Sequence, residues 1–263
     1  MNPMDFSCFT GNWPFHKVRC NTVEALTRQH RRCGITGGYI SAFEAIFYQD
    51  PYEAEKCLAE ELAGTSYRHA LVLNPTLPVW QADLHRAVEE LQIQAVRLIP
   101  AYHGYSLTDP VMEQVMETLQ AYNLPLILTY QLEDPRSAWI FRPRAVEPAE
   151  LTAFLDNFPQ VTTVLSNVRV SMLKYLAPQF QTRRNLFSDT AGFRSGMFPV
   201  EEAWPITGGQ LVFGTNAPLA PMASVYQIVD KAAVSGSIKD TIFSGTPFLK
   251  ELKTHDYLGD VYL

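Results

Sequence analysis

Short apolar runs alternate with longer amphipathic stretches along most of the chain. The runs have the length and composition of buried strands, and the stretches between them repeat apolar residues at the spacing of one helix face. The predicted strands cover residues 5–9, 38–43, 69–74, 95–100, 125–130, 162–166, 185–189 and 211–214. The predicted helices cover residues 22–32, 51–63, 78–91, 110–122, 148–157, 170–177 and 221–233.

Helix start signals agree with this division of the chain. Asn21 is the expected N-cap of the first helix, because its side chain can accept a hydrogen bond from a free amide of the first turn. Asp50 followed by Pro51 is expected to begin the second helix, and Asp109 followed by Pro110 repeats that signal before the fourth.

Eight strands, most of them followed by a helix, predict an α/β fold of the (β/α)8 TIM-barrel type. The chain has 263 residues, which suits a single barrel domain over residues 1–263, and no low-complexity linker divides it. The weakest matches are residues 191–209, rich in Gly and Pro, and the segment after Val234. A doubly wound open sheet fits less well, because the first turn contains one glycine, Gly11, and the bulky Trp13.

Composition narrows the expected partners. The net charge of -6, without a basic block, argues against nucleic acid. The N-terminus lacks a signal-peptide pattern, and no apolar run reaches the roughly 18 residues of a membrane span. The four cysteines have no CxxC spacing, so reduced thiols in a cytoplasmic protein are the simpler interpretation. We expect a cytoplasmic protein with a small-molecule ligand and no membrane partner; its aromatic residues are compatible with a homodimer.

The predicted strand ends carry hydroxyls and amides, together with one arginine and one aspartate. Chemistry in a TIM barrel collects at these ends. The candidate catalytic residues are Arg97 on the fourth strand, His103 in the loop after it, and Asp189 on the seventh strand. The candidate substrate-binding residues are Ser7, Trp13, Tyr102, Tyr105, Thr129, Asn167 and Asn216. Tyr130 and Trp139 are further aromatic candidates for the pocket wall.

Structural interpretations compete with these roles. Arg97 in an apolar strand needs a partner, and an ion pair with Asp189 or Asp5 would satisfy it as well as an anionic ligand would. His103 would equally suit a loop histidine that bonds to backbone. Asp134 and Arg136 are expected to form a pair within a turn, and His16 is interpreted as a packing residue.

Five segments in order resemble the amidohydrolase superfamily, in the branch of decarboxylase- and lactonase-like barrels called amidohydrolase-2. The segments are MDFSCFTGNWPF, VRLIPAYHGYSLTDP, NLPLILTYQLEDPR, VTTVLSNVR and LVFGTNAP, all between residues 4 and 218. The resemblance implies a TIM barrel whose metal ligands would fall on Ser7, Phe9, Thr129, Asn167 and Asn216. Arg97 lies near a lysine of some relatives, and a guanidinium cannot replace it as a ligand. These residue types are poor ligands, so no metal and no other cofactor is expected.

Three functions follow from this resemblance. The first is a metal-independent hydrolase of a small polar or anionic ester or lactone, in which Arg97 binds the substrate and His103 or Asp189 activates water. The alternative is a catalytically inactive, small-molecule-binding pseudoenzyme. The third is a metal-dependent hydrolase with relocated ligands at His103, Asp134 and Asp189. A barrel mouth filled by Phe9 would count against the first.

Overall fold

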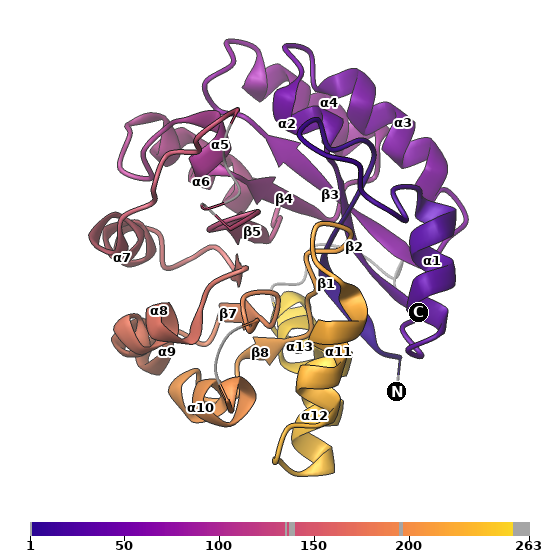
Figure 1. Cartoon of the computed structure of the whole chain (residues 1–263). Coiled ribbons are helices and arrows are strands. Elements are labelled where there is room, and N and C mark those ends of the chain that lie inside the picture. Colours follow the sequence, from indigo (N-terminus) through magenta and orange to yellow (C-terminus); the bar gives the residue numbers. More distant parts are fainter. Residues whose placement is uncertain (1, 135, 137–139, 195–196, 255–263) are drawn as a thin grey trace.

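The computed structural model describes residues 2–134, 136, 140–194 and 197–254. Its centre is a sheet of eight parallel strands in which every strand pairs with its neighbours in the chain, in the order β1 to β8. The strands are β1 Met4–Thr10, β2 Gly37–Ala42, β3 Tyr67–Leu73, β4 Ala95–Leu98, β5 Leu126–Thr129, β6 Thr163–Ser166, β7 Leu186–Asp189 and β8 Leu211–Val212. Figure 1 shows helices arranged as an outer ring around these strands.

Backbone hydrogen bonds between the two ends of the sheet bring it close to closure. The amide of Phe6 donates to the carbonyl of Phe213 at 2.8 Å, and the amide of Asn216 donates to the carbonyl of Ser7 at 2.7 Å. The amide of Phe9 donates to the carbonyl of Ala217 at 2.8 Å. The TIM-barrel prediction is therefore confirmed, and β8 is short because the chain after Val212 continues the contact with β1 as irregular backbone.

The helices follow the predicted positions in most units. They are α1 Val23–Arg31, α2 Glu44–Phe47, α3 Tyr52–Leu62, α4 Trp80–Glu90, α5 Pro100–His103, α6 Val111–Ala121, α7 Pro148–Asn157, α8 Val170–Tyr175, α9 Ala177–Thr182, α10 Pro199–Ile206, α11 Met222–Asp230, α12 Gly236–Ser244 and α13 Thr246–Thr254. None of these helices is long and apolar enough to cross a membrane in the part of the chain that the structure describes.

Three local predictions differ from the structure. The N-cap of α1 is Thr22 and not Asn21, since the Thr22 hydroxyl accepts from the amide of Ala25 at 3.2 Å. Helix α3 begins one residue later than predicted, with Pro51 as its N-cap. The predicted helix 170–177 ends at Tyr175 as α8, because Pro178 lacks the amide hydrogen that would continue it, and a separate helix α9 that was not predicted begins at Ala177.

The C-terminal helix α13, which the sequence pattern did not predict, closes the amino-terminal end of the barrel. Phe248 is 1% exposed, and its ring packs against those of Phe6, Tyr39 and Phe187 at centroid distances of 5.3, 6.1 and 5.5 Å. These rings join a small apolar cluster that also contains Ala70, Ala95, Ile127, Val164 and Val212. The barrel interior is thus apolar at this end, and its polar residues lie nearer the carboxyl ends of the strands.

Candidate functional site

The polar layer of the barrel interior is organised around Arg97. Its Nε donates to the hydroxyl of Ser41 at 2.8 Å, and its Nη1 donates to the hydroxyls of Thr129 at 3.0 Å and Ser7 at 3.3 Å. The guanidinium carbon lies 4.4 Å from the centre of the Phe9 ring, which stacks on Phe43. Two predicted substrate-binding hydroxyls are therefore engaged by the arginine itself.

Arg97 and Asp189 are both completely buried, and the charge of each one shifts the pKa of the other. Burial lowers the pKa of the Arg97 guanidinium to about 10, although the charge of Asp189 opposes this shift. Burial raises the pKa of the Asp189 carboxyl against the hydrogen bonds that it accepts. Its Oδ1 accepts from the amides of Asn167 at 2.9 Å and Ala191 at 3.0 Å. Within the described residues the two groups form no direct ion pair, and both Asp189 Oδ2 and Arg97 Nη2 lack a hydrogen-bond partner.

The two asparagines at the strand ends hold the loop after β5. Both have left-handed backbones, with φ of 58° at Asn167 and 56° at Asn216, a conformation that asparagine tolerates better than most residues do. Asn216 Nδ2 donates to the carbonyl of Leu132 at 2.7 Å, and Asn167 Nδ2 donates to the carbonyls of Leu132 and Gln131. A carboxylate could not donate these bonds. The side-chain amides of Asn167 and Asn216 therefore hold the loop after β5 in place, which aspartate at these positions could not do in the same way.

His103 lies away from this layer. Its Nε2 binds the carbonyl of Ile46 at 3.2 Å, and its ring lies beside that of Tyr105. Burial lowers the pKa of His103 to about 4, which keeps the ring neutral near pH 7. The structure thus brings Arg97 and Asp189 into one layer, but no contact joins His103 to either of them within the described residues.

The other predicted binding residues differ in burial. Trp13 and Tyr105 are buried, whereas Tyr102 is half-buried and lines a cavity. Asp134 pairs with Arg136 at 2.6 Å, as expected for the turn. Trp139 lies outside the described residues.

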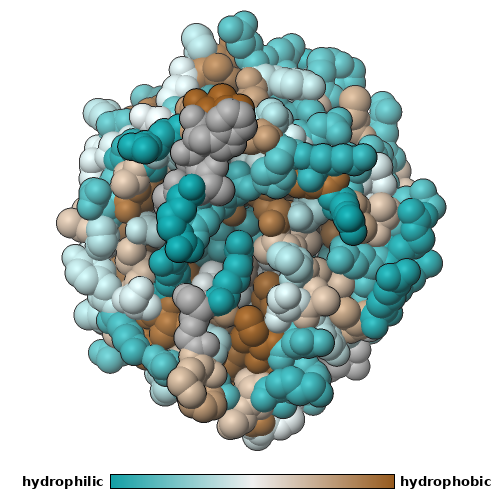
Figure 2. Space-filling model, viewed as in Figure 1, coloured by the Kyte–Doolittle hydropathy of each residue, from teal (hydrophilic) through white to brown (hydrophobic). Residues whose placement is uncertain are grey.

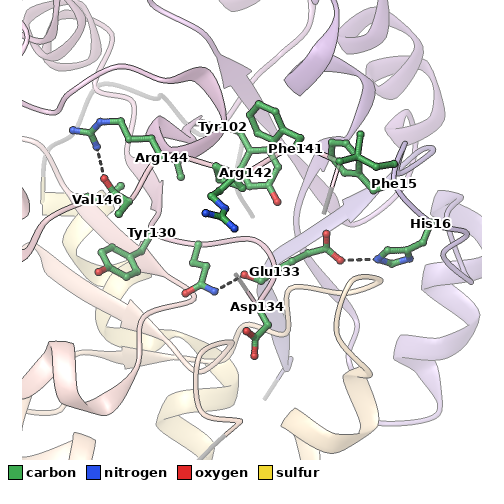
Figure 3. A pocket seen from close by; sticks show the side chains of 15 residues that line it. Phe15, His16, Tyr102, Tyr130, Glu133, Asp134, Phe141, Arg142, Arg144 and Val146 are labelled. Atoms are coloured by element: carbon green, nitrogen blue, oxygen red, sulfur yellow. Dashed lines mark hydrogen bonds and ion pairs between the residues drawn. The ribbon is translucent and has the colours of Figure 1, made fainter. Parts of the chain in front are cut away.

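A cavity of about 610 Å³ lies among the loops after β1, β4 and β5. Its aromatic wall consists of Phe15, Tyr102, Tyr130 and Phe141, and Figure 3 shows the guanidinium of Arg142 pointing between these rings and Glu133. Tyr130, at the end of the predicted fifth strand, lines it, whereas the predicted strand-end residues Arg97, Thr129 and Asp189 do not. In Figure 2, hydrophobic patches appear towards the middle of the face in view, and hydrophilic side chains dominate its rim.

One histidine–carboxylate pair faces this cavity, and the sequence did not single it out. His16 Nε2 lies 2.6 Å from Glu133 Oε1, and Trp13 Nε1 donates to Glu133 Oε2 at 3.0 Å. The hydrogen bond to Glu133 raises the pKa of His16. These two residues are 117 positions apart in the chain. The only signal in the sequence was the position of Glu133 directly after a strand end, so the interpretation of His16 as a packing residue missed a contact that only the fold creates.

The described residues offer one grouping of side chains that could hold a metal ion. The ligand atoms of Asp5, Cys8 and His30 lie within 4.8 Å of one another and are fully buried. Each already has a protein partner: Asp5 accepts from Thr215 and His30, His30 also binds the Tyr67 hydroxyl at 2.7 Å, and the Cys8 thiol donates to the carbonyl of Tyr39. The hydrogen bonding of the grouping is therefore complete without an ion.

The residues at the barrel axis fit a metal ion poorly. Among them, Asp189 is the one carboxylate in the described part of the chain, and its Oδ1 is occupied by two amides. The positive charge of the Arg97 guanidinium would also repel a divalent cation beside it. The proposed relocated ligands do not converge either, since His103, Asp134 and Asp189 each bind a different part of the chain.

Comparison with known proteins identifies the fold. No protein-family model and no curated protein matches the sequence. Among solved structures, 2,6-dihydroxybenzoate decarboxylase in complex with 2,6-dihydroxybenzoate is similar at 13% identity and a TM-score of 0.72, over 96% of this chain and 99% of that one. A dihydroxybenzoic acid decarboxylase from a Polaromonas species, with bound manganese and 2-nitroresorcinol, is similar at 15% identity and a TM-score of 0.71, over 100% of both chains.

A protein from Staphylococcus aureus provisionally described as an amidohydrolase is also similar, at 8% identity and a TM-score of 0.70, over 92% of this chain and 97% of that one. Similarity at these identities shows the fold. The resemblance to amidohydrolase-2-like barrels is confirmed at that level, and the structure neighbours are decarboxylases and an amidohydrolase-like protein.

Proposed function

We propose that this protein binds a small molecule in the cavity among its loops and does not carry out chemistry at its barrel axis. The observation that supports this most strongly is the burial of the axis. Ser7, Arg97, Thr129, Asp189 and Asn216 are 0% exposed, and none of them lines the loop cavity. A substrate therefore has no route to these groups in this conformation, whereas the loop cavity is open to it.

The shape and lining of the loop cavity favour a planar apolar ligand. The rings of Phe15 and Phe141 lie nearly parallel, at an angle of 8° and a centroid distance of 6.1 Å, and Tyr102 lies 5.5 Å from Phe141. Aromatic walls with a few polar groups are typical of small-molecule sites. A volume of about 610 Å³ accommodates a ligand of two or three fused rings with substituents.

Titration calorimetry with 1-naphthol as the probe tests this proposal. We expect measurable binding to the unmodified protein and at least a tenfold weaker affinity for the Phe141→Ala variant, because one face of the cavity is lost. Tyr175→Ala is the matched control, since Tyr175 is 53% exposed and lies on α8, outside the cavity lining. Absence of binding, or equal weakening by both substitutions, would contradict the proposal.

The metal-independent hydrolase remains the second candidate because of one observation, the His16–Glu133 pair in the cavity wall. In that reaction His16 takes a proton from water as the water oxygen attacks an ester carbonyl carbon, and it returns the proton to the leaving alkoxide as the C–O bond breaks. Arg142 would bind the carbonyl oxygen as its charge develops. Turnover of 1-naphthyl acetate that disappears in His16→Asn but not in His85→Asn would favour this candidate over binding alone.

A further inference from the structure

A second, smaller cavity adjoins the aromatic one and differs from it in charge. It has a volume of about 220 Å³ and shares Gln131, Glu133 and Asp134 with the aromatic cavity as a common wall. Its remaining lining comes from the loops after β5, β6 and β7 and includes Arg136, Arg169 and Arg194. The two cavities are therefore immediate neighbours among the loops at the same end of the barrel.

The positive charge in the second cavity exceeds the available negative charge. Asp134 is paired with Arg136 at 2.6 Å, and Glu133 is paired with His16 at 2.6 Å. Within the described ranges, neither Arg169 nor Arg194 has an ion-pair partner. In the described part of the chain these two guanidinium groups thus have no carboxylate within ion-pair distance, although the charges of Asp189, Asp134 and Glu133 act on Arg194 from further away.

Arg194 is held in place by bonds that leave part of its guanidinium free. Its Nε donates to the carbonyl of Ala191 at 3.1 Å, and its Nη2 donates to Oδ1 of Asn167 at 3.1 Å. Asn167 is itself fixed by its bonds to the loop after β5. No hydrogen bond of Arg194 Nη1 is formed within the described residues, so this group is available for a ligand oxygen.

We infer that the two cavities form one binding site for an aromatic compound that carries a phosphate ester. The ring packs on the aromatic wall formed by Phe15, Tyr102 and Phe141, and the phosphate lies between Arg169 and Arg194. Two guanidinium groups match the two negative charges and the several oxygens of a phosphate monoester. This inference rests on the proposed binding function and adds the class of ligand to it.

The test compares three probes by titration calorimetry: 1-naphthyl phosphate, 1-naphthol and inorganic phosphate. We expect the ester to bind at least tenfold more tightly than 1-naphthol, and this advantage to shrink as salt screens the charges. The advantage should disappear in the Arg169→Gln variant and in Arg194→Gln. Arg32→Gln is the matched control, because Arg32 is exposed and lines neither cavity.

The outcomes separate the inference from the proposed function. Equal affinity for 1-naphthyl phosphate and 1-naphthol overturns the inference and leaves the aromatic site intact. An advantage of the ester that survives Arg169→Gln and Arg194→Gln also overturns it, because the phosphate would then lie elsewhere. Binding of inorganic phosphate with no binding of either ring compound overturns the proposed function together with the combined site. Since Arg194 holds Asn167, Arg169→Gln is the decisive variant if Arg194→Gln unfolds.

Discussion

At the scale of single residues, Arg97 determines the character of the barrel interior. A buried guanidinium is costly unless hydrogen bonds and a counter-charge compensate it. Here three hydroxyls accept from it, Phe9 lies against its face, and Asp189 supplies the opposite charge. With a pKa of about 10 the guanidinium stays charged near pH 7. The hydroxyls of Ser7 and Thr129, which were candidates for substrate binding, thus bind the guanidinium of Arg97.

His103 gives this protein a defined sensitivity to acid. Its folded-state pKa of about 4 lies below the ordinary value of 6.5, so the fold favours the neutral ring. The contribution of the neutral His103 ring to the free energy of unfolding is therefore fully present above pH 6.5 and is lost as the pH falls towards 4. The pKa shift of His103 corresponds to about 3 kcal/mol of stability. We expect urea denaturation of His103→Gln at pH 7.5 and pH 5 to show a smaller loss of stability in acid than the unmodified protein.

His85→Gln is the matched control for this measurement, because His85 is exposed and its hydrogen bond is to the hydroxyl of Tyr122. It should leave the acid dependence of the unmodified protein in place. An identical pH dependence in His103→Gln and the unmodified protein would mean that burial of His103 is not the source of the effect.

At the scale of elements, helix α13 covers the amino-terminal end of the barrel with the side chain of Phe248. The turn before α13 places Gly245 at a φ of +60°, and a Cβ there would lie 2.2 Å from Cζ of Phe6. The glycine therefore allows the close approach that seats Phe248 among the rings of Phe6, Tyr39 and Phe187. Helix α13 is consequently part of the folded core.

Phe248→Ala should lower the free energy of unfolding by about 3 to 5 kcal/mol, the usual cost of removing a buried aromatic ring. Lys250→Ala on the same helix is the control, because Lys250 is exposed and its replacement should change stability by less than about 0.5 kcal/mol. Urea denaturation measures both. Similar stability of the two variants would show that α13 does not contribute to the barrel core.

At the scale of the whole molecule, the polar functions are separated into two regions. The barrel axis is buried, and its polar side chains bond largely to one another and to the backbone, although Arg97 Nη2 and Asp189 Oδ2 have no hydrogen-bond partner among the described residues. The loops above it contain open cavities with aromatic and arginine walls. The two asparagines at the ends of β6 and β8 connect these regions, since both bind the backbone of Gln131 or Leu132. These hydrogen bonds therefore attach the loop after β5, which lines the loop cavity, to the barrel.

We expect the purified protein to contain well under one divalent ion per chain. The axis residues offer poor ligands, and Asp5, Cys8 and His30 are already bonded to protein groups. Elemental analysis of protein prepared without chelator tests this, and a chelator should leave the midpoint of thermal unfolding unchanged. Close to one ion per chain would contradict the prediction. Loss of that ion in His30→Gln would then assign it to the Asp5–Cys8–His30 grouping.

The sequence by itself determined the architecture, because strand and helix periodicity are local properties that burial in a barrel preserves. The eight predicted strands all occur, and α7 has the predicted bounds. Helices α2, α5, α9, α10, α12 and α13 were not predicted, since they are short or contain Gly or Pro, so that their helical pattern is weak in the sequence. That residues 1–263 form a single domain stays a prediction.

Only the tertiary structure decided how the chemical groups are used. The sequence placed Arg97, Asp189 and the two asparagines at strand ends, but hydrogen bonding and burial depend on residues distant in the chain. The bonds of Arg97 to Ser7 and of Asn216 to Leu132 span 90 and 84 positions. The pair of His16 with Glu133 spans 117 positions. Sequence periodicity carries no information about such contacts. The sequence analysis named Tyr102 and Tyr130 as pocket candidates, but only the fold shows that they line one cavity with Phe15, Phe141 and His16.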